Sequence, residues 1–353
     1  MFNEKYKVIG VMSGTSLDGV DLACIIFNKS DHWSFLIEES ETIAYSSEWL
    51  NKLKNAIDFS QEELVQLNID YTKLLAKIIN EFIAKNNVTQ IDSICSHGHT
   101  ILHQPQNGFT LQIGNLPLLR EIVNHTIVCD FRVQDVKLGG QGAPLVPIGD
   151  ELLFSNYDYC LNLGGFSNVS FNENGNRIAF DISPVNTVLN FYASQLGFDY
   201  DDEGKIARSG NCNQDLLKQL NTIEFYSKPY PKSLGMEFVN ALIFPMIESF
   251  EIPVEDKLNT FIEHIAIQIS KVCTKPDAAL FITGGGVYNK YLIERIQLYL
   301  KSTKVILPDD KTIQFKEALI FGFLGVLRLR NEINVLASVT GAKENHSSGV
   351  VFN

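Results

Sequence analysis

One short turn near the start of the chain gathers groups that could bind a phosphorylated ligand. Two apolar runs, residues 9–12 and 20–27, flank it. The turn and the residues that follow it are Gly14, Thr15, Ser16, Leu17, Asp18, Gly19, Val20 and Asp21. Successive backbone N–H groups can bind an anion, the two hydroxyls can bond phosphate oxygens, and Asp18 and Asp21 could hold a hydrated Mg²⁺. The alternative is a structural β-hairpin whose Asp-Gly pair only sets the turn.

Two carboxylates stand at positions suited to acid–base work. Asp181 ends an apolar strand just before Pro184 and a helix that starts at Asn186. Partial burial there would raise its pKa and suit a general base, whereas the alternative is a helix cap. Glu317 opens an apolar helical run, residues 318–327. Its alternative is an acid in a first helical turn, where the helix dipole favours it.

Three histidines, His97, His99 and His103, have a spacing that resembles a metal site. Zinc sites need three or four ligands with a fixed second shell, and the nearby Cys95 lies in an apolar, strand-like run. The sequence therefore favours histidines that face a polar ligand or support the structure over zinc ligands.

Glycine turns close three apolar strands: one at Gly14, one at Gly164 and Gly165, and one at Gly284, Gly285 and Gly286. The third lies between a strand (278–283) and a helix (288–301), which is a usual place to seat a nucleotide. The chain contains neither the P-loop nor the Gly-x-Gly-x-x-Gly pattern, so Walker-type and dinucleotide-binding folds lose support. We expect a nucleotide held between two domains.

The elements that must position these groups alternate between strands and helices, which predicts an α/β layer fold. The first hairpin pattern recurs about 150 residues later at 159–171, followed by a strand at 177–182, so two similar halves are expected. Other predicted strands lie at 91–96 and 127–129. Helices are predicted at 60–85, where Ser60 and Glu63 form a capping box, and at 186–197, 234–247 (kinked or ended by Pro245), 254–275 and 315–331. The Gly- and Pro-rich stretch 130–150 is interpreted as a crossover that lines a cleft.

Composition narrows the function. A chain of 353 residues exceeds the usual size of one core, and a net charge of −12 argues against a nucleic-acid partner. The six cysteines are scattered, which favours reduced thiols in a cytoplasmic protein. The start lacks a signal-peptide pattern, and no apolar run approaches the roughly 18 residues that span a bilayer, so no membrane association is expected.

Six stretches together resemble one family, the anhydro-N-acetylmuramic acid kinases of bacterial cell-wall recycling. They are residues 10–21, 130–132, 139–147, 162–168, 284–289 and 339–342. The first and third are long and specific, and the resemblance covers nearly the whole chain. This family belongs to the sugar kinase, Hsp70 and actin superfamily. The resemblance therefore implies a two-domain actin-like ATPase fold, ribonuclease H-like and duplicated, with an interdomain cleft.

The same resemblance implies a division of the chain and a reaction. Residues 1–131 with 325–353 would form the lobe with the first phosphate loop, and residues 132–324 the second lobe. With ATP, Mg²⁺ and water, the enzyme would open the 1,6-anhydro ring of a small-molecule amino sugar. The products would be N-acetylmuramic acid 6-phosphate and ADP, and a homodimer is expected.

Site residues carry over by position. Asp181 matches the family's base and Glu317 a second carboxylate near the same water, an arrangement similar to inverting glycoside hydrolysis. Residues 14–21 would bind the ATP phosphates, with Mg²⁺ on Asp18 through water. Gly164 and Gly165 would face the phosphates, while Gly284, Gly285, Gly286 and Asn289 would seat the adenosine. Arg132, His97 and Thr100 would contact the amino sugar, with Arg132 on its lactyl carboxylate.

The chain departs from the family pattern after the base. Ile182 and Val185 replace the family's usual Thr and Gly, Ser183 replaces a Gly, and position 99 is His instead of the common Gln. These changes leave the sugar specificity open. The alternatives are a kinase of the same superfamily acting on another sugar or a carboxylic acid, a catalytically inactive sensor, and an actin- or Hsp70-like ATP switch.

Overall fold

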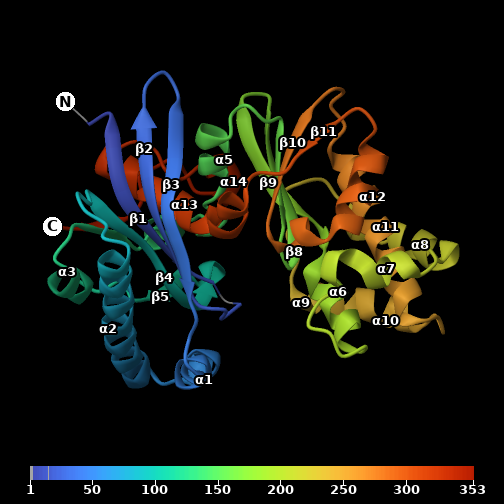
Figure 1. Ribbon diagram of the computed structural model, residues 1–353, viewed down its shortest axis with the longest axis horizontal. Helices are drawn as coiled ribbons and strands as arrows, with labels where there is room; N and C mark the ends of the chain where they lie inside the picture. The colour runs from blue at the N-terminus through green and yellow to red at the C-terminus, as the bar shows by residue number, and fades with distance from the viewer. Residues whose placement is uncertain (1–2, 15) are drawn as a thin grey trace. The chain divides into compact units, whose positions relative to one another are not determined.

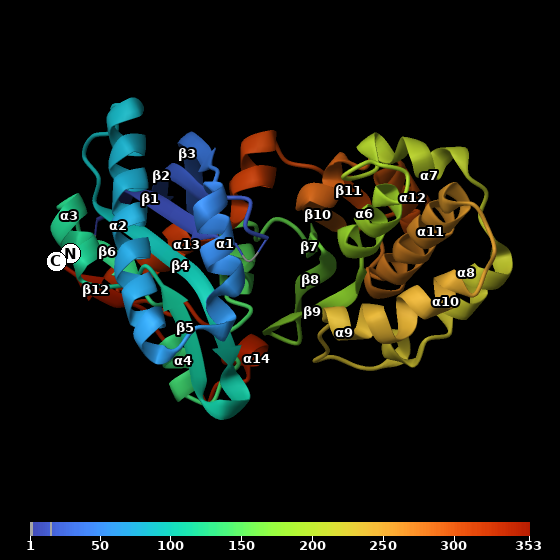
Figure 2. The ribbon, with the colours of Figure 1, turned by 90° about the horizontal axis from the view of Figure 1, so that it is seen from below.

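The computed structural model describes residues 3–14 and 16–353, which divide into two compact units. Unit 1 comprises residues 1–153 and 315–353, and unit 2 comprises residues 154–314. Figure 1 and Figure 2 show that each unit is a twisted sheet with helices packed against it. No helix in the described part of the chain is long and apolar enough to cross a membrane. All six cysteines are free thiols, and five of them are buried.

Unit 1 is built on a sheet with the strand order β12-β6-β4-β1-β2-β3, with β5 paired to β4. β1 and β2 form the predicted first hairpin, and β4 and β6 run parallel to β1. The strands are β1 (Lys5–Ser13), β2 (Val20–Lys29), β3 (Trp33–Ile43), β4 (Ser93–Gln104), β5 (Phe109–Ile113), β6 (Ile127–Cys129) and β12 (Val350–Phe352). The helices are α1 (Ser47–Asn55), α2 (Gln61–Lys85), α3 (Leu118–Val123), α4 (Val133–Lys137), α5 (Pro147–Leu153), α14 (Ala337–Thr340) and α13 (Asp310–Leu329), which begins in unit 2.

Unit 2 repeats this plan with the strand order β11-β10-β7-β8-β9. β7 and β8 form the second predicted hairpin, and β10 runs parallel to β7. The strands are β7 (Tyr159–Leu163), β8 (Phe166–Glu173), β9 (Asn176–Pro184), β10 (Ala279–Thr283) and β11 (Lys304–Ile306). The helices are α6 (Asn186–Ser194), α7 (Lys205–Ser209), α8 (Gln214–Asn221), α9 (Met236–Phe238), α10 (Phe244–Glu248), α11 (Val254–Val272) and α12 (Lys290–Leu300).

The two sheets share one strand order, since β3-β2-β1-β4-β6 corresponds to β9-β8-β7-β10-β11. In both, three antiparallel strands are followed by two that run parallel to the first. The prediction of a duplicated, two-domain α/β fold is therefore confirmed.

The division between the units differs from the expected one, which placed residues 132–153 and 315–324 in the second lobe. The fully buried Asp135 accepts hydrogen bonds from Gly142 N–H (2.6 Å) and Thr340 Oγ1 (2.7 Å), which ties the stretch after residue 131 to unit 1. β1 packs so closely on α13 that a Cβ at Gly10 would lie 2.0 Å from the Ala318 carbonyl oxygen. Both segments therefore belong to unit 1.

The helix predicted at 234–247 consists of three segments. α9 is followed by a wide π-helical turn, Val239–Ile243, and then by α10, which carries Pro245 in its first turn. Proline has no N–H to donate and its ring crowds the preceding turn, so the irregular geometry lies just before it. The predicted disturbance at Pro245 is thus confirmed.

The predicted capping box of α2 is present. Ser60 Oγ accepts from the Glu63 N–H (3.3 Å), and Glu63 Oε2 accepts from the Ser60 N–H (2.8 Å). Replacing Ser60 by Ala removes one cap, so we expect Ser60→Ala to lower the free energy of unfolding by about 1 kcal/mol in urea titrations. Ser34→Ala serves as the control, because the side chain of that exposed serine on β3 has no hydrogen bond to any described residue; equal stability of the two variants would contradict the cap.

Candidate functional site

The turn between β1 and β2 presents backbone and short polar side chains at the surface of unit 1. Ser16 and Asp18 are exposed, and Leu17 takes a left-handed conformation (φ 64°) that leaves its N–H bonded to the Gly14 carbonyl at 3.3 Å. Thr15 lies outside the described residues. Asp18 makes no hydrogen bond or ion pair with any described residue, so its carboxylate is available to a hydrated cation.

The last residues of the same turn, Gly19, Val20 and Asp21, already make contacts within unit 1. Gly19 has φ 155°, and a Cβ there would lie 2.4 Å from the Ile43 carbonyl oxygen, so this glycine is required by the approach of β3. The Val20 side chain is fully buried in the core. Asp21 Oδ1 accepts from Thr42 Oγ1 (2.6 Å), and burial raises the pKa of its carboxyl. Only the backbone of Gly19 and Val20 remains for a ligand.

Asp181 lies on β9 at a one-residue bulge. Asn168 pairs with Asp181 and Ser167 with Ser183, which leaves Ile182 without a partner on β8. A bulge re-aims the side chains beside it, and bulges are frequent next to active sites. The local geometry of the candidate base is thus set by a break in the sheet rather than by regular pairing.

The carboxylate of Asp181 is half-buried, and among the described residues only one of its two oxygens has a hydrogen-bond partner. Its Oδ2 accepts from the Leu234 N–H at 2.8 Å, and its own N–H donates to the Lys232 carbonyl at 3.1 Å. Burial raises the pKa of Asp181, and the hydrogen bond from Leu234 partly offsets that rise. The alternative of a helix cap is wrong, because Val185 occupies the N-cap of α6 and no side chain caps that helix.

Glu317 lies within α13 rather than at its start. The helix begins at Asp310, and Phe315 leaves helical geometry (φ −110°, ψ 18°), so Glu317 lies two residues after a break instead of in the expected first turn. Water reaches its side chain, yet the protein packed around it displaces enough solvent to raise its pKa. The nearby Arg132 opposes this rise, while Asp21 adds to it.

Arg132 and His97 come together beside Glu317 in unit 1. Arg132 donates from Nε to His97 Nε2 (2.8 Å) and from Nη1 to the Gly142 carbonyl (2.6 Å). The imidazole of His97 and the guanidinium of Arg132 both pack on the ring of Phe321. The His97 centroid lies 4.6 Å from the Phe321 centroid, and Arg132 Cζ lies 5.9 Å from it. Burial lowers the pKa of Arg132 to about 10 and that of His97 well below its usual value. His97 is therefore neutral, and Nη2 of Arg132 makes no hydrogen bond within the described residues.

The other polar residues of β4 have partners of their own. Thr100 Oγ1 accepts from Gln112 Nε2 (3.3 Å), and His103 Nδ1 bonds Thr110 Oγ1 (3.0 Å). Across the described residues, no three His, Cys, Asp or Glu side chains come together in a group that could hold a metal ion.

A buried hydrogen-bond chain under the first turn was not foreseen. Ser13 Oγ bonds Tyr45 Oη (2.6 Å) and His99 Nδ1 (2.8 Å), and Tyr45 Oη bonds Tyr71 Oη (2.6 Å). Burial lowers the pKa of His99 to about 4, so the imidazole stays neutral. Because Ser13 directly precedes Gly14, this chain holds the entry to the turn.

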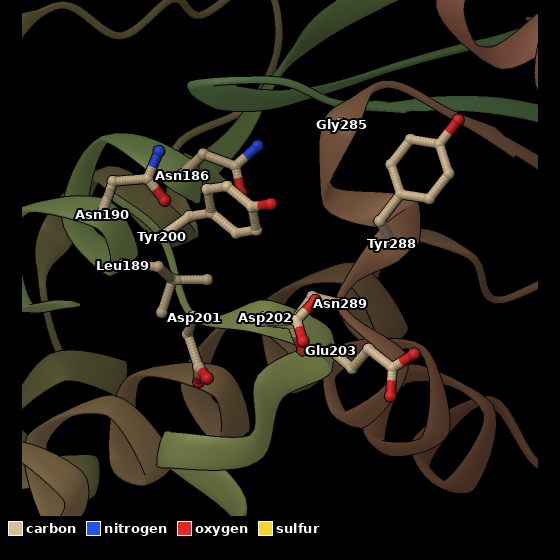
Figure 3. A pocket seen from close by; sticks show the side chains of 10 residues that line it. All are labelled: Asn186, Leu189, Asn190, Tyr200, Asp201, Asp202, Glu203, Gly285, Tyr288 and Asn289. Carbon is tan, nitrogen blue, oxygen red and sulfur yellow. The ribbon is translucent and has the colours of Figure 1, made fainter. Parts of the chain in front are cut away.

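A pocket of about 440 Å³ lies beside the third glycine turn, within unit 2 (Figure 3). It is lined by Asn186, Leu189, Asn190, Tyr200, Asp201, Asp202, Glu203, Gly285, Tyr288 and Asn289. The half-exposed rings of Tyr200 and Tyr288 stand on two sides of the open space. A cavity with aromatic walls and a few amide groups is typical of small-molecule sites.

The three glycines of this turn differ in what they touch. Gly284 has φ 86°, and a Cβ there would lie 2.6 Å from Asn162 Oδ1; a Cβ at Gly286 would lie 2.7 Å from Leu163 Cβ. At Gly285 the nearest protein atom would be 3.8 Å away, on Asn186, so the space beside Gly285 is the pocket. Asn289 lines the pocket and caps α12, since its Oδ1 accepts from the Leu292 N–H (2.9 Å).

Hydrogen bonds join the second glycine turn, Gly164 and Gly165, to the start of α6, beside the pocket at Gly285. The Gly164 carbonyl accepts from the Asn186 N–H (3.2 Å), and the Gly165 carbonyl accepts from Val185 N–H (2.8 Å) and Thr187 Oγ1 (2.9 Å). Within unit 2 the structure thus brings Gly164 and Gly165 to the first turn of α6, whose Asn186 also lines the pocket.

The family model for anhydro-N-acetylmuramic acid kinase matches residues 6–353. The chain belongs to the anhydro-N-acetylmuramic acid kinase family. A relative of that name from Pseudomonas savastanoi pv. phaseolicola is 35% identical over 362 residues, which cover 98% of each chain. Another from Shewanella frigidimarina is 33% identical and covers 98% of this chain and 97% of its own. The resemblance found from the motifs is confirmed.

Among solved structures, (R)-2-hydroxyglutaryl-CoA dehydratase component A from Acidaminococcus fermentans is similar with a TM-score of 0.48 at 12% identity. The match covers 92% of this chain and 99% of that one. At this level the similarity does not bear on activity.

The anhydro-N-acetylmuramic acid kinase motifs do not reveal most of the pocket. Leu189, Asn190 and residues 200–203 come from a helix and a loop whose sequence has no fingerprint spacing. Besides the predicted Gly285 and Asn289, Tyr288 is the pocket residue that the sequence could have indicated, because it lies between Gly286 and Asn289 in the stretch predicted to seat the adenosine.

Proposed function

We propose that this protein is an ATP-dependent kinase that opens the 1,6-anhydro ring of anhydro-N-acetylmuramic acid with water and phosphorylates O6. The observation that carries the proposal is the match to the family over residues 6–353, with relatives of 33–35% identity along nearly their full length. The products would be N-acetylmuramic acid 6-phosphate and ADP. We also propose a cytoplasmic location, where ATP is available, and a homodimer, to be checked by light scattering.

The adenosine of ATP is proposed to lie in the pocket beside Gly285, between the rings of Tyr200 and Tyr288, with Asn289 as a polar contact. The unpaired N–H groups of the turn 14–21 are proposed to bind phosphate oxygens, and so are the N–H groups of Gly164 and Gly165. Asp18 fits a hydrated Mg²⁺, because its exposed carboxylate has no partner among the described residues. When bound, Mg²⁺ would neutralise phosphate charge.

Asp181 is proposed as the general base. Its raised pKa and its free Oδ1 suit a group that accepts a proton from water. The water oxygen bonds to the anomeric carbon as the bond from that carbon to the bridging oxygen breaks. The bridging oxygen, still attached to carbon 6, takes the γ-phosphoryl group, and ADP leaves. Glu317 is proposed as a second catalytic carboxylate.

Arg132 is proposed to hold the lactyl carboxylate of the sugar with Nη2, while His97 and Gly142 fix the guanidinium. Lysine has one nitrogen where the guanidinium has three, so it cannot occupy the Nε and Nη1 positions and also present a donor at the position of Nη2. We therefore expect Arg132→Lys to raise KM for the sugar about tenfold and to leave KM for ATP unchanged in steady-state assays. The control is Arg208→Lys, because Arg208 forms only an exposed ion pair with Glu294, which contributes little. An unchanged sugar KM in Arg132→Lys would remove this role.

The decisive test of the function is incubation with ATP, Mg²⁺ and anhydro-N-acetylmuramic acid in ¹⁸O-water. Label at the anomeric hydroxyl of a 6-phosphorylated product supports both substrate and mechanism. ADP release only with other acceptors from a small panel of sugars and acids would instead indicate a related kinase. ATP hydrolysis that needs no acceptor would indicate a conformational switch.

A further inference from the structure

A second pocket, of about 300 Å³, lies in unit 2 and shares no lining residue with the pocket beside Gly285. Its walls come from β7, β8, β9, the end of α11 and the segment 226–232. The lining residues are Tyr159, Phe171, Glu173, Phe180, Ile182, Tyr226, Lys228, Pro229, Tyr230, Lys232, Gln268, Lys271, Val272 and Thr274. It therefore combines five aromatic rings with three lysines and one carboxylate.

Lys232 is a half-buried cation that has no acidic partner among the described residues. Its Nζ donates to the Phe225 carbonyl (3.2 Å) and lies 4.8 Å and 5.7 Å from the ring centroids of Phe225 and Phe180. Burial lowers its pKa. The carboxylate in the lining, Glu173, is bonded to the Tyr230 hydroxyl instead. An ammonium group held in this way retains donors for an anion.

A second unused donor lines the same pocket. The Tyr226 hydroxyl is buried and has no hydrogen-bond partner in the described protein. Buried polar groups normally have one, so this hydroxyl is a donor that the described protein does not use. The rings of Phe180 and Tyr230 stack at 5.4 Å and form a flat apolar wall. Aromatic faces beside an anion-binding group suit a small ring that carries a carboxylate or phosphate.

The pocket is connected to Asp181. Phe180 and Ile182, the two neighbours of Asp181 on β9, both line it. The Lys232 carbonyl accepts the Asp181 N–H, and the Leu234 N–H donates to Asp181 Oδ2. Any displacement of residues 232–234 therefore acts on the carboxylate proposed as the base, and an added negative charge nearby raises its pKa.

We propose that this pocket is a second ligand site, which takes a small sugar anion and adjusts Asp181 through residues 232–234. Its effect on Asp181 rests on the proposed function, under which the product is itself a sugar phosphate. The binding part does not, because binding is measured without turnover.

Calorimetry with the full chain, in the presence of saturating ADP, tests the site. The probes are N-acetylglucosamine 6-phosphate, glucuronate, neutral N-acetylglucosamine and inorganic phosphate. We expect saturable binding of the two sugar anions, weakened about tenfold or more by Lys232→Met, several-fold by Tyr226→Phe, and little by Lys232→Arg. Lys218→Met, an exposed lysine on α8, is the matched control. Lys232→Met keeps the backbone carbonyl that accepts from Asp181.

Four outcomes would overturn the proposal or one of its parts. No saturable binding, or equal binding to Lys232→Met and wild type, rejects the site. Equal affinity for inorganic phosphate and the sugar phosphate rejects the role of the aromatic wall. If the anions bind but the acid limb of the pH–rate profile does not move to higher pH, the link to Asp181 is wrong. A chain that binds the probes but shows no kinase activity would instead count against the proposed function alone.

Discussion

Asp181→Asn is expected to lower kcat about 1000-fold or more while leaving the affinity for ATP within about twofold of wild type. Asparagine has the shape of aspartate, and its Oδ1 still accepts the Leu234 N–H that positions the side chain. It cannot take a proton from water. The variant thus removes the proposed base and retains the local structure. A lower kcat would therefore result from the missing proton acceptor and not from a changed structure. Single-turnover ADP release and calorimetry with ATP measure the two quantities.

The pH dependence provides a second readout of the same residue. Because burial raises the pKa of Asp181, the carboxylate gains its proton at a higher pH than an exposed aspartate. Activity should therefore be complete above this raised pKa and fall as the pH drops through it. The remaining activity of Asp181→Asn should lack that acid limb.

The control for Asp181→Asn is Asp215→Asn, an exposed acid in the first turn of α8. It should leave kcat unchanged. Residual turnover of Asp181→Asn above about one tenth of wild type, with an unaltered acid limb, would show that another group activates the water. Glu317 would then be the candidate, since its pKa is also raised.

Local sequence patterns predict those parts of the structure that local interactions decide. Turn residues and the periodicity of apolar residues predict the hairpins β1–β2 and β7–β8, the capping box at Ser60 and the strand–glycine–helix order around Gly284. The two sheets confirm the expected repeat. These features need no knowledge of distant contacts.

The features that the sequence did not predict depend on tertiary contacts. The bulge at Ile182 arises from how β9 meets β8, and the break at Phe315 interrupts a run that reads as continuous helix. The hydroxyl chain under Ser13 joins residues from four elements or loops, and Tyr200 reaches its pocket from an irregular segment. The segment after residue 131 joins unit 1 through Asp135, a contact with Thr340 that no local pattern encodes.

Gly285→Val is expected to weaken ATP binding roughly 100-fold without lowering the melting temperature. Among the described residues, the nearest atom to a Cβ at Gly285 would be 3.8 Å away, and the φ of Gly285 lies outside the left-handed region that favours glycine. The valine methyl groups would therefore project into the space proposed for adenosine, between Tyr200 and Tyr288. We therefore expect the folded protein to accommodate the side chain and the nucleotide to be excluded by it. Calorimetry with ATP and a thermal melt measure the two effects.

The neighbouring Gly284→Ala separates a binding effect from a folding effect. Gly284 has φ 86°, and its Cβ would lie 2.6 Å from Asn162 Oδ1 and 2.8 Å from the Leu163 backbone, so this variant should lose stability. Opposite patterns are thus expected one residue apart: loss of ATP affinity with normal stability at 285, and loss of stability at 284. If Gly285→Val binds ATP as tightly as wild type and melts normally, the nucleotide does not use this pocket. The adenosine would then have to be placed elsewhere, since the other glycines of the turn are required by contacts with Asn162 and Leu163.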